Sequence, residues 1–290
     1  MPTAIVTGCS TGIGFATALR LAREGCRVHA SVRSEASGAA LAEAAGDLPV
    51  ALLVLDVDDD ESVAGAVGSV IAAEGGIDIL VNNAGVGSLA AIEDTPMELF
   101  ASVMNTNAWG TVRCTQAVLP TMRAQRGGCI VNVTSIVGRV ALGGQAAYSA
   151  SKWATEGFSE ALAVEVAPFG IRVAIVEPGV VATPIYAKSA ESPPDFGSPY
   201  AEATMRTARY LMAGLGDPAT PDDIAATVWH AISTDQPTLR HPAGRDAQAI
   251  AARRPGISDE DWIAALATPD DDEWRAGIRE WTGTDVPPLG

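Results

Sequence analysis

A tyrosine and a lysine four residues apart are the first pair in this sequence that could do chemistry. Tyr148 and Lys152 enclose Ser-Ala-Ser, and on a helix that spacing puts both side chains on one face, a single turn apart. A free phenol has a pKa of about 10, too high for efficient proton transfer near neutrality. A cation roughly 4 Å away, at an effective dielectric of 20, would stabilise the phenolate by up to about 4 kcal/mol. The spacing alone is more typical of an ordinary surface pair on a helix, and a tyrosine acid or base is favoured only when Ser135, Asn107 and a glycine loop accompany it.

A glycine cluster is the second candidate. Gly8, Gly12 and Gly14 stand between the apolar run Ala4-Ile5-Val6 and an amphipathic segment. Glycines let a backbone turn tightly and approach a pyrophosphate, whose charge the N-terminal amides of a following helix stabilise. A simple tight turn is the alternative. The position between a strand and a helix favours a phosphate-binding loop.

The elements that must position these residues are short apolar runs alternating with longer Ala-rich segments. Such alternation predicts βαβ units and a parallel sheet covered on both faces. The fold class is therefore α/β, a doubly wound (Rossmann) parallel sheet in a single domain with a C-terminal helical extension. The expected strands are 4–6, 27–30, 51–55, 77–81, 129–133 and 172–176, and 238–242 could add a seventh.

We expect residues 1–250 to form the dinucleotide-binding and catalytic domain. Within it, residues 184–221 are rich in Pro, Ser and Ala and read as a loop with one or two short helices. An insertion of this length after a strand usually covers a site. Residues 251–290 form an acidic helical extension, with helix starts at 258–261 and 268–271.

Composition excludes several classes of function. The 290 residues are 48% hydrophobic, and the formal net charge of -16 would repel nucleic acid or an anionic membrane. The longest apolar runs fall well short of the about 20 residues that span a bilayer. The N-terminus lacks the basic region of a signal peptide, which predicts a cytoplasmic protein. The four cysteines show no Cys-x-x-Cys spacing and the three histidines lie far apart, so neither a metal site nor a disulfide framework is expected.

Further motifs follow in a fixed order. They are Gly-x-x-x-Gly-x-Gly at 8–14, Asn-Asn-Ala-Gly at 82–85, Asn107, Ser135, Tyr148 with Lys152, and Pro-Gly-Val-Val-Ala-Thr at 178–183. In this combination the chain resembles the short-chain dehydrogenase/reductase family, from residue 3 to about 245. Phrases at 110–113, 116–120 and 168–170 are most similar to its hydroxysteroid and retinol dehydrogenase branch.

The resemblance implies hydride transfer between nicotinamide C4 and the carbon of a secondary alcohol or ketone, without a metal. Tyr148 would exchange the proton and Ser135 would polarise the substrate oxygen. Lys152 would orient the nicotinamide ribose and lower the pKa of Tyr148, and Asn107 would hold a water that links Lys152 to solvent. The residues implied in cofactor binding are Gly8, Ser10, Thr11, Gly12, Ile13, Gly14, Arg33, Asp56, Val57, Asn83, Ala84, Gly85, Tyr148, Lys152, Pro178, Gly179, Val181 and Thr183.

The end of the second strand predicts which cofactor is preferred. NAD-using relatives commonly carry an acidic residue there, whereas this chain has Val32 followed by Arg33. A guanidinium can bind a 2′-phosphate, with Ser10 and Ser34 as further donors. We therefore expect NADP(H), with NAD(H) as the alternative.

Other functions stay open at this level. A nucleotide-sensing protein without turnover would normally lack Tyr148 or Lys152, and both are present. Enoyl reductases of the family usually space the two residues more widely, so carbonyl chemistry is favoured over enoyl reduction or epimerisation. The resemblance also implies a homodimer or homotetramer, and the partner is a small carbonyl or alcohol substrate that no motif identifies.

Overall fold

The sheet has seven parallel strands in the order β3-β2-β1-β4-β5-β6-β7. The computed structural model describes residues 1–186 and 197–288. The strands are β1 Thr3–Val6, β2 Arg27–Val32, β3 Val50–Val54, β4 Ile79–Asn82, β5 Gly128–Val133, β6 Ile171–Pro178 and β7 Arg240–Ala243. All six expected strands and the seventh are present, so the predicted doubly wound α/β fold is confirmed.

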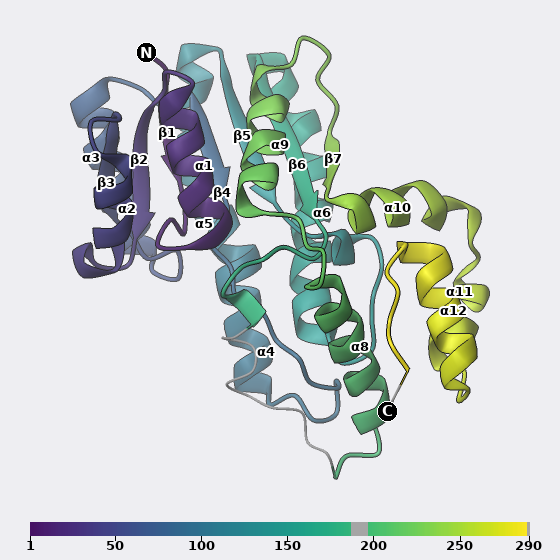
Figure 1. Ribbon diagram of the computed structural model, residues 1–290. Helices are drawn as coiled ribbons and strands as arrows, with labels where there is room; N and C mark the ends of the chain where they lie inside the picture. Colours follow the sequence, from purple (N-terminus) through teal and green to yellow (C-terminus); the bar gives the residue numbers. More distant parts are fainter. Residues whose placement is uncertain (187–196, 289–290) are drawn as a thin grey trace.

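Helices cover both faces of the sheet (Figure 1). One face carries α1 Gly12–Arg23, α2 Ala39–Ala45 and α9 Pro221–Ser233, and the other carries α3 Asp60–Glu74, α5 Gly110–Gln125 and α6 Ala146–Val166. Successive residues of β1 show why its sequence is apolar throughout. Val6 packs into the core under α1 and α9, whereas Ile5 packs under α3, α5 and α6, and both are fully buried.

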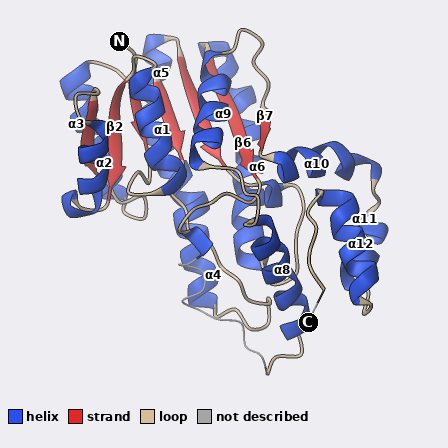
Figure 2. Ribbon diagram, in the orientation of Figure 1, coloured by secondary structure: helices blue, strands red, loops and turns tan. Residues whose placement is uncertain are grey.

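The carboxyl ends of the strands point toward α4 Met97–Met104 and α8 Ala201–Gly214 (Figure 2). The chain passes from α4 into α5 through a π-helical turn, Asn105–Trp109. Such turns often occur at functional sites because they redirect backbone carbonyls and side chains. Here the turn contains Asn107.

The C-terminal residues form α10 Arg245–Arg253, α11 Asp259–Ala267 and α12 Asp271–Thr282. Both expected helix starts are confirmed, because Ser258 and Asp270 accept backbone N–H groups at the beginnings of α11 and α12. Trp262 stacks on Trp281 with ring centroids 4.9 Å apart, and its indole N–H donates to the carbonyl of Ala141 at 3.2 Å. These helices therefore pack against the chain that follows Ser135.

The insertion expected at 184–221 contains the 14-residue helix α8, and its residues 187–196 lie outside the described part of the chain. Within the residues that are described, no helix is both long and apolar enough to cross a membrane.

Candidate active site

The glycine loop between β1 and α1 has the geometry of a phosphate cradle. Gly8 and Gly12 have φ of +71° and +63°, a region that favours glycine. A Cβ on Gly14 would lie 2.4 Å from both the Asn83 amide nitrogen and the carbonyl oxygen of Gly8. The first turn of α1 receives no side-chain cap from Thr11, so its N–H groups are available to an anion. The loop therefore fits a dinucleotide pyrophosphate.

Residues after β4 hold this loop in place. The Asn83 side chain donates to the carbonyls of Thr7, at 2.9 Å, and Gly8, at 3.2 Å. The Thr7 hydroxyl accepts the backbone N–H groups of Asn83 and Ala84 at 2.9 and 3.0 Å. Thr7 thus supports the glycine loop. It was not among the predicted site residues, although its position directly before Gly8 places it in the loop motif.

A cleft of about 540 Å³ runs along the carboxyl ends of the strands. It brings together almost all the predicted cofactor residues; only Gly14 lies behind its surface. Those that line it are Gly8, Ser10, Thr11, Gly12, Ile13, Arg33, Asp56, Val57, Asn83, Ala84, Gly85, Tyr148, Lys152, Pro178, Gly179, Val181 and Thr183. Ser31, Ser37 and Tyr186 also line the cleft and were missed. One oxygen of Asp56 accepts the N–H of Asp58 at 3.1 Å, so this carboxylate also shapes its own loop.

Tyr148 lies in the first turn of α6, and its side chain forms a hydrogen bond with that of Ser135. The Ser135 hydroxyl also donates to the carbonyl of Pro178 at 3.3 Å. Burial raises the pKa of Tyr148 to about 12, and the bond with Ser135 opposes this rise. Without a cofactor, the rise in the Tyr148 pKa caused by desolvation is therefore larger than the lowering expected from Lys152. The phenol is held in its protonated form.

Lys152 lies one turn further along α6 and is 5% exposed. Its ammonium donates to the carbonyl of Val133 at 3.1 Å and lies 5.7 Å from the centre of the Tyr148 ring. Burial lowers the pKa of Lys152 to about 8, and the charge of Glu156 opposes this effect. The predicted one-face arrangement of Tyr148 and Lys152 is therefore present.

Asn107 does not line the cleft. Its carboxamide accepts the N–H of Val86 at 2.8 Å, donates to the carbonyl of Val86 at 2.9 Å, and donates to the Ser151 hydroxyl at 3.0 Å. Its backbone carbonyl accepts the hydroxyls of Thr111 and Thr155. Asn107 therefore joins the loop after β4 to α6, next to the turn that carries Tyr148 and Lys152.

A second cavity, of about 530 Å³, adjoins the cleft and is mostly apolar. The two cavities share Ser135, Tyr148, Gly179, Ile185 and Tyr186. Side chains of α8 form much of its wall: Met205, Ala208, Arg209, Tyr210, Leu211 and Met212. No sequence motif indicates these residues.

Asp246 from α10 also reaches this cavity, and its carboxylate accepts the N–H of Val180 at 2.8 Å. A Cβ on Gly179 would lie 2.0 Å from an Asp246 oxygen. This contact explains the glycine of the Pro178-Gly179 motif. Because Asp246 lies 66 residues beyond Val180, no local pattern could have identified it.

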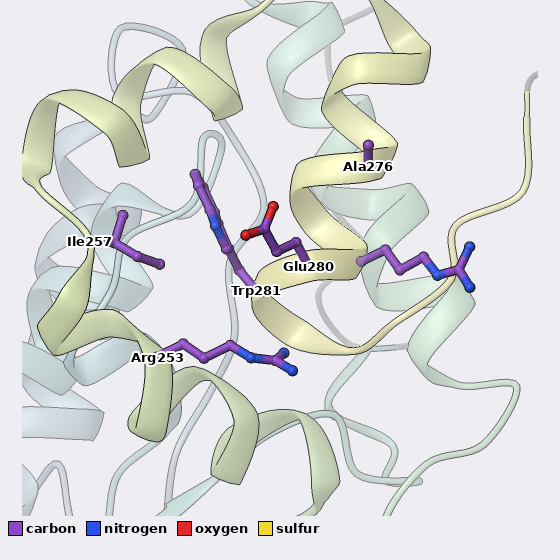
Figure 3. A pocket seen from close by; sticks show the side chains of 6 residues that line it. Arg253, Ile257, Ala276, Glu280 and Trp281 are labelled. Carbon is purple, nitrogen blue, oxygen red and sulfur yellow. The ribbon is translucent and has the colours of Figure 1, made fainter.

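Another hollow, of about 670 Å³, lies on the C-terminal helices (Figure 3). It is lined by Arg253, Ile257, Ala276, Arg279, Glu280 and Trp281. None of these was a predicted site residue, and none lines the cleft or the apolar cavity. Across the described ranges, no three His, Cys, Asp or Glu side chains gather as metal ligands would.

Comparison with known proteins decides the family. Residues 2–194 match the short chain dehydrogenase family. The chain belongs to the short-chain dehydrogenase family. It is 36% identical to retinol dehydrogenase 8 from Bos taurus, over 82% of this chain and 80% of that protein. It is 37% identical to cyclopentanol dehydrogenase from Comamonas testosteroni, over 80% of this chain and 89% of that protein.

The solved structure of a short-chain dehydrogenase from Streptomyces avermitilis superposes with a TM-score of 0.78 at 32% identity. It covers 91% of this chain and 97% of its own. The protein is thus an NAD(P)-dependent oxidoreductase acting on alcohol and ketone groups, and the resemblance stated from the motifs is confirmed.

Proposed function

We propose that this short-chain dehydrogenase interconverts a largely apolar secondary alcohol and its ketone with NADP(H). The observation that carries the proposal is the shared wall of the two cavities. Tyr148 and Ser135 line both the dinucleotide cleft and the apolar cavity. Groups placed there would reach a substrate oxygen in the apolar cavity while the cleft holds the cofactor.

In the reducing direction Tyr148 gives its phenolic proton to the substrate oxygen, and burial keeps that proton in place beforehand. Ser135 donates a hydrogen bond to the same oxygen as negative charge develops on it. The hydride that the carbonyl carbon accepts would come from nicotinamide C4 of NADPH bound in the cleft. Lys152 would hold the nicotinamide ribose, and its positive charge favours the phenolate that remains on Tyr148.

Asn107 supports this site without lining the cleft. It fixes the turn of α6 through Ser151 and the loop after β4 through Val86. Exchange of protons between Lys152 and solvent, through a water held near Asn107, completes the proposed relay.

The substrate class follows from the lining of the second cavity. Leu142, Val180, Leu211 and Leu215 surround a space of about 530 Å³, within the range of cavities that hold drug-sized ligands. Ala208→Phe would fill part of this space. We expect a large rise in KM for bulky ketones and little change for acetone-sized ones.

The preference for NADP(H) rests on the adenosine end of the cleft. Val32, which is 3% exposed, ends β2 without a carboxylate, and Arg33 directly after it lines the cleft. Ser34 and Ser37 lie beside it and cap one another. A guanidinium with neighbouring hydroxyls suits a 2′-phosphate, whereas an adenosine 2′-hydroxyl needs an acceptor.

We also propose a homo-oligomer that pairs through α5 and α6. Trp109 and Trp153 are each 51% exposed, and Val164 is 77% exposed. Large apolar side chains exposed near and along α6 favour burial against a second copy. Analytical ultracentrifugation tests this: a monomer at micromolar concentration refutes it.

The function is tested with a panel of ketones and secondary alcohols, followed by nicotinamide absorbance with each cofactor. Tyr148→Phe should keep NADPH binding within about threefold and lower the rate of the chemical step by about 10² to 10⁴. Tyr200→Phe, at an exposed tyrosine outside both cavities, is the matched control. A Tyr148→Phe enzyme with more than about a tenth of the wild-type rate, where chemistry limits turnover, refutes the assigned role.

A further inference from the structure

A buried network of charges lies behind the proposed catalytic residues. Glu177 on β6 is fully buried, and Arg139 binds both of its carboxylate oxygens. Arg240 on β7 donates to Glu156 at 2.8 Å and lies 3.8 Å from Glu177. Glu156 on α6 is 5% exposed. Positive and negative groups therefore alternate from Arg139 to Glu156, on four different elements.

The network reaches the chain segment that forms the site. The second oxygen of Glu156 accepts the Thr134 hydroxyl at 2.7 Å. Thr134 stands between Val133, whose carbonyl accepts Lys152, and Ser135. A Cβ on Gly138 would lie 2.9 Å from Cγ of Glu156, so the loop after Ser135 also rests on this side chain.

Lys152 lies next to this network of charges, four residues before Glu156 on α6. Its ammonium is buried, and within the described residues no carboxylate lies at ion-pair distance from it. Glu156, four residues along the same helix, is the charge that favours its protonated form. Two neutral groups lie beside Lys152: the ring of Tyr148 on its own helix, with its centre 5.7 Å away, and the carbonyl of Val133 on β5, which accepts its ammonium. Beyond Glu156 lie Arg240 on β7 and Glu177 on β6, with Arg139 after β5.

We propose that Glu156 is a positioning residue whose negative charge stabilises the ammonium of Lys152, while Arg240 binds Glu156 and Arg139 binds Glu177. The physical reason is that a buried charge is costly unless it is paired and hydrogen-bonded, and the two oxygens of Glu156 accept hydrogen bonds from Arg240 and Thr134. Its charge acts on Lys152 through space, without a direct bond that would hold the lysine away from its ligand. The inference rests on the proposed function, because it explains how the lysine of that site stays cationic although buried.

The sequence permits a direct test on the free protein. Lys152 and Lys188 are its only two lysines, so protein labelled with ¹³C-lysine gives two Cε signals, which Lys188→Arg assigns. Titration of the Lys152 signal reports its charge without cofactor or turnover. In Glu156→Gln we expect the midpoint to fall by about one to two pH units, the order of magnitude for loss of one charge a helical turn away at an effective dielectric near 20.

Glu160→Gln is the matched control, because Glu160 also binds Arg240, at 2.7 Å, but its side chain is 56% exposed. It should move the midpoint by less than about 0.3 units. Thr134→Val keeps the charge and removes the hydrogen bond, so its midpoint should stay near that of wild type. Glu156→Asp keeps the negative charge, so its midpoint should lie close to that of wild type. Loosening of the fold cannot imitate the expected result, since exposure would raise the midpoint toward about 10.4.

An unchanged midpoint in Glu156→Gln overturns the inference, as does an equal shift in Glu160→Gln. If Glu156→Gln does not fold, Glu156→Gln with Arg240→Gln removes the ion pair as a unit, and a downward shift is still expected. A midpoint that is unchanged or raised in the double variant overturns the inference too. The proposed function can fail separately from this inference. In that case the wild-type protein reduces no ketone, but the titration midpoint of Lys152 still falls in Glu156→Gln.

Discussion

Replacement of Arg33 by alanine should lower kcat/KM for NADPH and leave the value for NADH almost unchanged. Arg33 lines the cleft directly after β2, and its side chain is exposed there. A hydrogen bond between charged partners contributes about 1.5–3 kcal/mol. Because solvent screens an exposed site, we take the lower part of this range, about 1.5–2.5 kcal/mol, or roughly 10- to 70-fold in kcat/KM.

The assay measures initial rates with each cofactor varied at a saturating ketone concentration. Arg23→Ala is the control, because Arg23 is exposed on the last turn of α1 and does not line the cleft. The loss in Arg33→Ala should shrink as salt rises, since screening weakens the wild-type contact. A wild-type preference for NADH, or an Arg33→Ala enzyme that uses NADPH as well as wild type, would refute the assignment of the 2′-phosphate to Arg33.

Three further predictions have defined outcomes. Val32→Asp should move preference toward NADH by roughly 10- to 100-fold, by repelling a 2′-phosphate and accepting from the ribose; equal ratios of kcat/KM before and after would contradict this. Gly14→Ala should lower Tm and abolish cofactor binding, because its Cβ would overlap Asn83 and the Gly8 carbonyl. Gly68→Ala on α3, where nothing lies within 4 Å, should instead stabilise by about 0.5–1 kcal/mol, and similar unfolding curves for the two would refute the reasoning. Lys152→Met should stabilise the protein by about 1–3 kcal/mol at pH 7 while activity is lost, which urea unfolding at pH 7 and pH 9.5 checks.

The sign of the last prediction follows from the lowered pKa of Lys152. Folding moves it from 10.5 to about 8, so between these values the unfolded chain binds more protons than the folded one. Stability from this group therefore rises with pH from about 8 to 10, and the cost of burying the ammonium is fully present below pH 8. The advantage of Lys152→Met should accordingly be larger at pH 7 than at pH 9.5.

The sheet and the dinucleotide loop could be predicted because their signals are local. Ala4-Ile5-Val6 is apolar on both faces since helices cover both sides of β1, and Gly8, Gly12 and Gly14 follow within a few residues. The pair Tyr148 and Lys152 shares one helix turn, so spacing alone places both on one face. In each case sequence distance and spatial distance are both short.

The apolar cavity could not be predicted, because its wall is assembled from distant segments without a motif. Tyr210 of α8 donates to Asp246 of α10 at 3.4 Å, and both face residues that follow β6. The burial of Tyr148 and Lys152 could not be predicted for a related reason. A spacing argument counts a charge but not the desolvation of the groups around it, and burial is the larger effect on both residues.

These two opposed shifts explain why the site needs charges behind it. A phenol with a raised pKa is a good donor to hold in readiness, but the phenolate that it leaves needs a cation beside it. Burial weakens that cation by favouring neutral Lys152 at pH values just above neutrality. A carboxylate in direct contact would restore the charge and also compete with a cofactor for the ammonium. Glu156, bound by Arg240 and Thr134, supplies the field without the contact, so Lys152 stays charged and keeps donors for the ribose.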